Sequence, residues 1–340
     1  MKAIIFGAGR MGRRFVQIAR NNDLDVVGIC DVSDAALAIA STEYGLPESA
    51  LFLDAETMAS TAGAEVAIVA TTAPAHHPYS MLAMRNGARY LLCEKPMAHS
   101  LARCDEMTAE AKERDVVFGV NHQMRHIGEY KRFKELADSP QFGGMHSMVI
   151  QSGNAGLSMN GLHFFEGFQF IADAKITRVT GWIRPEKAPN PRGVEFNDPG
   201  GSIRVETSAG HSLYLDMDTR NGHGMKVVLG AAYGQFVADL LSGSITVANR
   251  LETDRAKTSG LYGTDGETSV ESYVPMNAID SSTIVLREML KGHAGNFVTA
   301  AEARHLVSIL VAANVSSEQG NRTIDLASEP LPLDREFPWA

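Results

Sequence analysis

The sequence has few of the features that mark secreted, membrane-spanning or metal-binding proteins. Its three cysteines, Cys30, Cys93 and Cys104, match no paired ligand spacing, so we expect reduced, buried thiols and no metal site. No stretch approaches the roughly 18 apolar residues of a membrane span. The apolar run at residues 3–6 is too short for a signal peptide. We therefore expect a soluble, cytoplasmic protein.

Positive charge is also scarce. The 31 Lys and Arg residues are scattered and outnumbered by 40 Asp and Glu, which gives a formal net charge of −9. Such a chain would repel a polyphosphate backbone, so we expect neither a nucleic-acid partner nor a membrane partner. The hydrophobic fraction of 44% is ordinary for a globular protein, and 340 residues are about twice the usual domain size. Two domains are the natural expectation.

The first third of the chain alternates short apolar runs with helical patterns. The runs lie at residues 3–6, 26–30, 66–70, 90–93 and 116–120, and helical patterns follow several of them, at 35–40 and 79–86 among others. Continuous apolar runs suit strands that are buried on both faces. Repeated strand–helix alternation predicts an α/β fold with a parallel Rossmann sheet, which we assign to residues 1–121.

Beyond residue 122 the pattern changes to stretches of period two. These lie at 145–152, 175–184, 202–207, 212–217 and 225–230, and they predict a large, mostly antiparallel open sheet. Helical patterns interrupt it at 162–172, 281–291 and 300–318. Residues 185–199 are rich in Pro, Asn and Gly and indicate a long loop that covers a site. We assign residues 122–340 to a second α/β domain for substrate binding and oligomerisation.

A glycine-rich turn follows the first strand. It has the pattern Gly-x-Gly-x-x-Gly at Gly7, Gly9 and Gly12, it opens a helix, and Asp31 follows 19 residues after Gly12 at the end of the next strand. In this context Gly7 allows the tight turn, Gly9 lets the backbone approach a pyrophosphate, and Gly12 permits close helix–strand packing. The helix N-terminus offers N–H groups and partial positive charge to phosphates. The pattern predicts dinucleotide binding.

Asp31 indicates which dinucleotide is bound. Its carboxylate is placed to accept hydrogen bonds from the adenosine ribose and would repel a 2′-phosphate, which favours NAD over NADP. NADP stays an alternative because the guanidinium of Arg10 is close in sequence to the same pocket. Asp31 as a helix N-cap is another alternative, although Ser33 is equally placed for that role.

The chain resembles the Gfo/Idh/MocA oxidoreductase family, named after glucose-fructose oxidoreductase and inositol dehydrogenase. The most specific match is Glu94-Lys95-Pro96, and the likeness extends over residues 43–47, 66–77, 86–96, 299–300 and 312–320. The resemblance implies a Rossmann domain followed by an open-sheet domain that forms homodimers or homotetramers. It implies sugar, cyclitol or nucleotide-sugar substrates bound between the nicotinamide and that sheet.

The resemblance also implies site residues. Lys95 would hydrogen-bond the reacting hydroxyl, since an ammonium there stabilises a developing alkoxide. His77 would lie near the cofactor, with His76 on the surface, and Arg125 would lie close to the substrate. Together with the glycine turn, this predicts cofactor contacts from Gly7, Gly9, Arg10, Met11, Gly12, Asp31, Thr71, Thr72, His77, Glu94, Lys95 and Gln123.

The family's second motif is incomplete in this chain. Members carry an aspartate four residues before a histidine, whereas residues 157–163 read Leu-Ser-Met-Asn-Gly-Leu-His, so Met159 replaces the aspartate and His163 is kept. We expect His163 to accept the hydroxyl proton and to be a weaker base without the carboxylate. Asn160 and Glu166 are each three residues away and are candidates to orient the ring. The alternatives are a helix cap for Asn160 and a solvated side chain for Glu166.

The leading hypothesis is therefore an NAD(P)-dependent oxidoreductase acting on the CH–OH group of a sugar-like substrate, with Lys95, His163 and Asn160 as catalytic residues and Lys95, Arg125 and His163 at the substrate. A dinucleotide-binding sensor without turnover, and NAD-assisted glycoside hydrolysis or elimination, are the alternatives. Candidate anchors for an acidic group on the substrate are Arg184, Arg192, Arg220 and His223.

Overall fold

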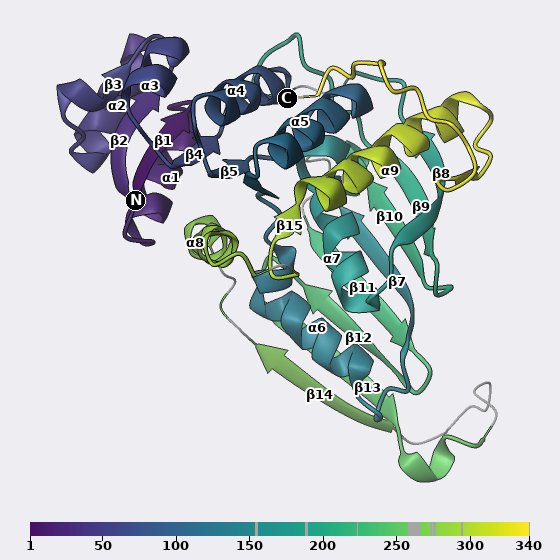
Figure 1. Ribbon diagram of the computed structural model, residues 1–340. Helices are drawn as coiled ribbons and strands as arrows, with labels where there is room; N and C mark the ends of the chain where they lie inside the picture. The colour runs from purple at the N-terminus through teal and green to yellow at the C-terminus, as the bar shows by residue number, and fades with distance from the viewer. Residues whose placement is uncertain are drawn as a thin grey trace.

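The computed structural model describes residues 1–153, 156–187, 190–222, 224–257, 266–272, 274, 277–293 and 295–339. It contains two sheets, one at the N-terminal end and a larger one that extends away from it (Figure 1). The predicted α/β class, with a Rossmann sheet followed by a mostly antiparallel sheet, is confirmed.

The first sheet has the strand order β15-β6-β5-β4-β1-β2-β3. Its strands are β1 (Lys2–Phe6), β2 (Asp25–Cys30), β3 (Leu51–Phe52), β4 (Val66–Val69), β5 (Tyr90–Cys93), β6 (Val117–Val120) and β15 (Val298–Thr299). All pairings are parallel except that of β15 with β6. The chain proceeds from β1 outward to β3 and then returns to place β4 on the other side of β1, so the carboxyl ends of β1 and β4 form a crevice suited to a ligand.

Helices cover both faces of this sheet. They are α1 (Arg10–Arg20), α2 (Asp34–Tyr44), α3 (Ala55–Thr61), α4 (Ala73–Arg85), α5 (Leu101–Glu113) and α8 (Ala278–Leu290). Ala3 and Ile5 of β1 belong to the core under α1 and α8, whereas Ile4 and Phe6 face the core under α4 and α5. This two-sided burial explains why the strands are continuous apolar runs rather than alternating ones.

Helix α8 and strand β15 return to the first sheet from the far end of the chain. Val285, Leu286 and Met289 of α8 are buried in the same core as α1. Gly119 in β6 makes room for them, because a Cβ there would lie 2.9 Å from the sulfur of Met289. The chain after residue 277 therefore contributes to the Rossmann fold, and the division at 121/122 remains a prediction about the two domains.

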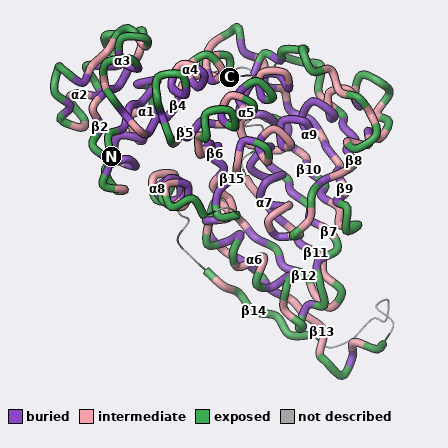
Figure 2. Tube along the Cα trace, in the orientation of Figure 1, coloured by how far each residue is buried: buried purple, intermediate pink, exposed green. Residues whose placement is uncertain are grey.

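The second sheet has the strand order β14-β13-β12-β11-β7-β10-β9-β8-β16. Its strands are β7 (Met145–Ser152), β8 (Ile176–Ile183), β9 (Gly201–Thr207), β10 (Ser212–Met217), β11 (Met225–Ala231), β12 (Gly234–Asp239), β13 (Ser244–Arg250), β14 (Gly266–Ser272) and β16 (Ile324–Asp325). The pairs are antiparallel apart from β10 with β7. Strands β12, β13 and β14 had not been predicted, and most of β14 is exposed at one edge (Figure 2).

Helices α6 (Gly128–Asp138), α7 (Leu162–Ala172) and α9 (Ala300–Glu318) cover one face of the second sheet (Figure 1). Their aromatic and aliphatic side chains, among them Phe133, Phe164 and Leu310, join a core that continues into the first domain. Helix α9 starts with a capping box between Thr299 and Glu302, which satisfies the first backbone N–H groups. In the described part of the chain, no helix combines the length and apolar character needed to span a bilayer.

Candidate functional site

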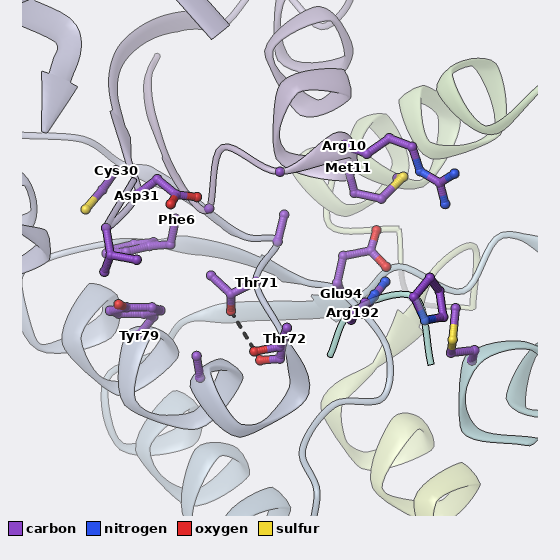
Figure 3. Close-up of a pocket in the computed structure, with 17 residues that line it drawn as sticks. Phe6, Arg10, Met11, Cys30, Asp31, Thr71, Thr72, Tyr79, Glu94 and Arg192 are labelled. Carbon is purple, nitrogen blue, oxygen red and sulfur yellow. Dashed lines mark hydrogen bonds between the residues drawn. The ribbon is translucent and has the colours of Figure 1, made fainter. Parts of the chain in front are cut away.

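A cavity of about 600 Å³ opens where β1, β2, β4 and β5 end. Its walls are formed by Phe6, Gly7, Gly9, Arg10, Met11, Cys30, Asp31, Val32, Ala70, Thr71, Thr72, Ala75, Tyr79, Glu94, Met159, Pro191 and Arg192. Figure 3 shows Phe6, Asp31 and Tyr79 toward one end, and Arg10, Glu94 and Arg192 toward the other. The cavity therefore runs from the first strands of the sheet to the second domain.

The three glycines of the turn have different surroundings. Gly7 has φ +98°, and a Cβ there would lie 2.5 Å from the carbonyl oxygen of Ala70. A Cβ on Gly12 would lie 1.8 Å from the carbonyl oxygen of Gly7, so close helix–strand packing requires glycine. Gly9 has no heavy atom within 4 Å of its Cβ position, and it precedes α1 without a side-chain cap. The exposed N-terminus of α1 thus adjoins the cavity, which suits a pyrophosphate.

Asp31 is anchored beside this turn. Its Oδ2 accepts a hydrogen bond from the backbone N–H of Ala8 at 2.8 Å, and Oδ1 accepts from the N–H of Ser33 at 3.0 Å. Ser33 rather than Asp31 caps α2, through the N–H of Ala36. Each carboxylate oxygen has a further lone pair, so Asp31 can also accept from two hydroxyl groups in the cavity. The geometry fits recognition of a ribose diol.

Glu94 lines the cavity, and Lys95 follows it in the chain. Glu94 Oε1 accepts from Nδ2 of Asn121 at 2.8 Å, which fixes its side chain. Lys95 is partly buried, precedes a cis peptide bond to Pro96, and donates from Nζ to the carbonyl oxygen of Met159. Burial lowers the pKa of the Lys95 ammonium. Arg192 lowers it further, whereas the carboxylates of Glu94 and Asp198 oppose this shift. The Lys95 side chain therefore links the two domains through Met159, which lines the cavity.

The two neighbouring histidines of α4 lie in different surroundings. The expectation that His76 lies on the surface is wrong, because His76 is 0% exposed and its ring contacts the carbonyl oxygens of Pro96 at 2.7 Å and Thr71 at 3.2 Å. His77 contacts Glu106 at 2.7 Å and is not among the residues that line the cavity, so its predicted contact with the cofactor stays a prediction. One residue corresponds to about 100° of rotation around a helix, so only one of the two can face the sheet.

His163 lies at the start of α7, after a π-helical turn at Leu157–Gly161. It is 7% exposed, and its ring packs edge-on against His122 with 5.5 Å between centroids. Burial lowers the pKa of His163 well below its usual value, and the Lys95 ammonium and His122 lower it further. Among the described residues, its Nδ1 has no hydrogen-bond partner. His163 is therefore a neutral imidazole near Lys95.

Asn160 belongs to the same π-helical turn, and its backbone N–H donates to the carbonyl of Gly156 at 2.9 Å. We expected Asn160 on one helical face with His163, but that spacing argument holds for α-helices, and the π turn changes it. A role for Asn160 in orienting His163 stays a prediction.

Arg125, Glu166 and Gln123 are held by contacts within the protein. Arg125 Nε donates to Glu166 Oε1 at 2.7 Å, and its Nη1 donates to the carbonyl of Gly295 at 2.8 Å. Glu166 is 2% exposed, so the alternative of a solvated side chain is wrong. Its carboxylate contacts Arg125 rather than His163. Gln123 accepts from Ser282 of α8 at 2.9 Å. These three residues therefore bind elements together around the site.

The remaining basic candidates differ in their surroundings. Arg184 and Arg220 both donate to the carboxylate of Asp218 at 2.7 Å, so both guanidinium groups form ion pairs within the protein. Arg192 lies in the predicted loop and lines the cavity with Pro191, as expected for a loop that covers a site. His223 lies outside the described residues. Arg192 is thus the second-domain arginine that reaches the cavity.

The residues that were missed in the sequence include Tyr79 and others of the cavity wall, and two that lie near Lys95, namely His122 and Asp198. His122, directly after β6, is buried against His163, and burial together with Lys95 lowers its pKa to about 3. Asp198 is 4% exposed and binds the backbone of Ser158 and Met159. His122 directly precedes Gln123, a cofactor contact predicted from the sequence, so its position could have identified it as a site residue. Asp198 is 40 residues from its partner in sequence, and no spacing rule connects them.

Comparison with known proteins supports the N-terminal assignment. Residues 1–122 match the family model described as "Oxidoreductase family, NAD-binding Rossmann fold" (GFO_IDH_MocA). The 1,5-anhydro-D-fructose reductase of Ensifer adhaerens is 29% identical over 140 residues, which are 41% of this chain and 41% of that relative. The inositol 2-dehydrogenase of Salmonella paratyphi B is 27% identical over 146 residues, 42% of this chain and 43% of the relative. The chain thus matches about two fifths of the length of these curated relatives.

A solved structure shares the fold of both domains. An oxidoreductase from Agrobacterium radiobacter, crystallised with NAD+, L-tartaric acid and magnesium, has a TM-score of 0.79 and 15% sequence identity. The match covers 96% of this chain and 99% of that chain. Together with the family match, it confirms the resemblance predicted from the sequence.

Proposed function

We propose that this chain, whose N-terminal domain belongs to the Gfo/Idh/MocA oxidoreductases with their NAD-binding Rossmann fold, moves a hydride between NAD and the hydroxyl or carbonyl carbon of a sugar, cyclitol or nucleotide sugar. The observation that carries the proposal is that the Lys95 ammonium lies near His163 of the second domain and donates to the carbonyl of Met159, which lines the cavity that begins at the glycine turn. An ammonium beside a neutral imidazole suits chemistry at a CH–OH group.

The chain's residues fit NAD. The N-terminus of α1 and the open space at Gly9 accommodate the pyrophosphate, and Asp31 faces the position of the adenosine ribose. A 2′-phosphate would bring negative charge next to Asp31, which favours NAD over NADP. Bound NAD would supply the carbon that accepts or donates the hydride.

Lys95 and His163 would have different roles at the substrate. The Lys95 ammonium stabilises negative charge on the reacting oxygen, because a buried positive charge acts strongly where solvent screening is weak. His163 accepts the hydroxyl proton, since its lowered pKa keeps it neutral at physiological pH. Two relatives named for 1,5-anhydro-D-fructose and inositol support a polyhydroxylated substrate.

The test is turnover with NAD and a panel of sugars, cyclitols and nucleotide sugars, in the unaltered protein and in Lys95→Met. We expect Lys95→Met to lower turnover by about 100-fold or more, the typical effect of removing one oriented charge-stabilising group, while affinity for NAD changes only a few-fold. Lys112→Met, on the exposed side of α5, is the matched control and should behave as the unaltered protein. NAD binding without turnover of any substrate would contradict the enzyme proposal and favour the sensor.

We also propose a homodimer or homotetramer formed through the open face of the second sheet. Val237, Val149 and Tyr214 lie in one cross-strand row on β12, β7 and β10 and are 37–43% exposed. An apolar row of this kind suits an interface with a second copy. Light scattering should give a mass of at least twice 36.7 kDa, and Tyr214→Glu should lower it. A monomeric mass for the unaltered protein would refute this proposal.

The cytoplasm stays the proposed location. Cys30, Cys93 and Cys104 are free and buried, as in proteins of reducing compartments. Fractionation of the source cells, with the protein detected by antibody, is the measurement, and recovery from an oxidising compartment would contradict it.

A further inference from the structure

The carboxylate of Asp198 is built into the backbone that precedes His163. Its Oδ1 accepts from the N–H of Ser158 and its Oδ2 from the N–H of Met159, both at 2.8 Å. Gly156 is adapted to this contact: it has φ +81°, and a Cβ there would lie 1.9 Å from Oδ2 of Asp198. The carboxylate thus occupies the N-terminal end of the π-helical turn. Burial raises the pKa of Asp198, and the two backbone donors and the Lys95 ammonium oppose this rise.

The same turn holds the ammonium of Lys95. The carbonyl oxygen of Met159 accepts the hydrogen bond from Nζ of Lys95, while the N–H of Met159 donates to Asp198. Met159 therefore carries a carboxylate on its N–H side and an ammonium on its carbonyl side. The order of contacts is Asp198, the backbone of Met159, and Lys95, and every member is at least partly buried.

Resting on the function proposed above, we propose that Asp198 is the positioning residue of the site. It holds the turn at Ser158 and Met159, it fixes the carbonyl that orients the Lys95 ammonium, and it supplies the negative charge that Met159 cannot provide. A methionine at position 159 is then compatible with turnover, because the carboxylate arrives from the loop before β9 instead of from the helix itself.

The charge balance around Lys95 shows what removal of Asp198 would do. The groups that face its ammonium are Glu94 and Arg10 from the first domain, His122 after β6, His163 on α7, and Arg192 and Asp198 from the second-domain loop. Of these, Glu94 and Asp198 stabilise the protonated amine, whereas burial, Arg192 and Arg10 favour the neutral one. Loss of the Asp198 charge leaves Glu94 as the opposing anion, so the pKa of Lys95 falls.

The experiment compares Asp198→Asn with Asp198→Glu in the full-length protein. Lys95 is titrated directly, as the ¹³C-dimethyl signal of the reductively methylated protein, assigned by its absence in Lys95→Arg. We expect Asp198→Asn to move this titration and the alkaline fall of kcat to lower pH. We further expect it to lower kcat by about 10-fold or more, the scale of a lost hydrogen bond to a charged group, with KM for NAD within about threefold. Asp198→Glu, which keeps the charge, should recover the titration and most of kcat.

Asp218→Asn is the matched control. Asp218 is also a buried carboxylate of the second domain that accepts backbone and arginine hydrogen bonds, but it is not among the charges that act on the Lys95 ammonium. The Asp218→Asn substitution should leave the titration of Lys95 unchanged. If Asp198→Asn does not fold, Gly156→Ala takes its place, since its added Cβ displaces the carboxylate, and the titration of Lys95 should again move to lower pH.

The titration separates this inference from the function proposed above. An unchanged Lys95 titration in the folded Asp198 or Gly156 variant overturns the inference, even if the unaltered protein is an active oxidoreductase. Equal loss in Asp198→Glu and Asp198→Asn also overturns it, because charge would then not matter. A shifted titration together with no turnover of any substrate by the unaltered protein supports the positioning role of Asp198 and refutes the proposed function.

Discussion

The carboxylate of Asp31 is hydrogen-bonded to the backbone N–H of Ala8, at 2.8 Å, within the glycine turn. The residue at the end of β2 thus supports the turn that follows β1, in addition to facing the cavity. Its second oxygen accepts from Ser33 at the start of α2. Two local anchors leave the side chain with little rotational freedom, so a ribose would meet a preorganised acceptor.

Cofactor preference follows from this arrangement. NAD should bind more tightly than NADP, and Asp31→Ala should narrow the difference, because the repulsion of a 2′-phosphate is removed. The same variant should bind NAD about 10-fold or more weakly, the scale of a lost charged hydrogen bond. NADH and NADPH fluorescence titrations measure both effects, and Asp34→Ala, exposed on α2, is the control. Equal affinities of the unaltered protein for both dinucleotides would contradict the assignment of Asp31.

Substitution of two glycines of the same turn by alanine should affect different properties, NAD affinity for Gly9 and stability for Gly12. Gly9→Ala places a Cβ in open space with φ −65°, so the free energy of unfolding should change by less than about 0.5 kcal/mol, while NAD affinity falls because the methyl group occupies the pyrophosphate position. Gly12→Ala meets the carbonyl of Gly7 and should destabilise the protein by about 1–3 kcal/mol. Denaturant unfolding and NADH titration of both variants distinguish them. Full NAD affinity in Gly9→Ala would place the pyrophosphate elsewhere.

The proton-transfer assignment has a pH signature. His163 has a pKa well below 6.5, so the rise of substrate oxidation that accompanies its deprotonation should lie at acid pH. His163→Ala should lose about 100-fold to 10,000-fold in kcat, the usual contribution of general acid–base catalysis. Asn160→Ala should lose less, because an amide carries no charge. The profile of kcat against pH for each variant is the measurement.

Met159→Asp provides the complementary test. A carboxylate at position 159 adds negative charge four residues before His163 in the sequence, which favours the protonated imidazole, so the pKa of His163 should rise and the acid limb should move to higher pH. A profile that neither Met159→Asp nor His163→Ala changes would show that another group, such as Lys95, carries the proton.

We expect the ion pair between Arg125 and Glu166 to contribute to the stability of the fold rather than to substrate affinity. Arg125→Met leaves the buried Glu166 carboxylate without its cation and should cost about 3 kcal/mol or more of unfolding free energy. Burial already raises the pKa of Glu166, and loss of the arginine raises it further. A protein is destabilised as the pH rises when a carboxyl group has a higher pKa in the folded than in the unfolded state. The loss of unfolding free energy in Arg125→Met should therefore be larger at pH 8 than at pH 5.

Urea unfolding at the two pH values measures this deficit, and Arg125→Met combined with Glu166→Gln should recover much of it. If Arg125→Met instead raised the substrate KM with no loss of stability, Arg125 would belong to the substrate site, as the family resemblance implied.

Several features could be predicted because neighbouring residues determine them. The strand–glycine–helix unit depends on residues 3–19. Helix 300–318 was predicted with its observed bounds, and the structure shows that Thr299 and Glu302 form its cap. Lys95 and His163 were predicted from local strings that the resemblance made recognisable, and their proximity to each other is consistent with that prediction.

The sequence by itself determined strands β1, β2, β4 to β6 and β7 to β11, together with the glycine turn, since these follow from hydrophobic periodicity and backbone sterics over short stretches. Tertiary structure alone decided which of His76 and His77 faces the sheet, that Arg125 is paired with Glu166, and that Asp198 reaches the turn before His163. Each of these depends on how elements far apart in the chain pack together. A buried charge takes whichever partner that packing brings within hydrogen-bonding distance, and no spacing in the sequence records it.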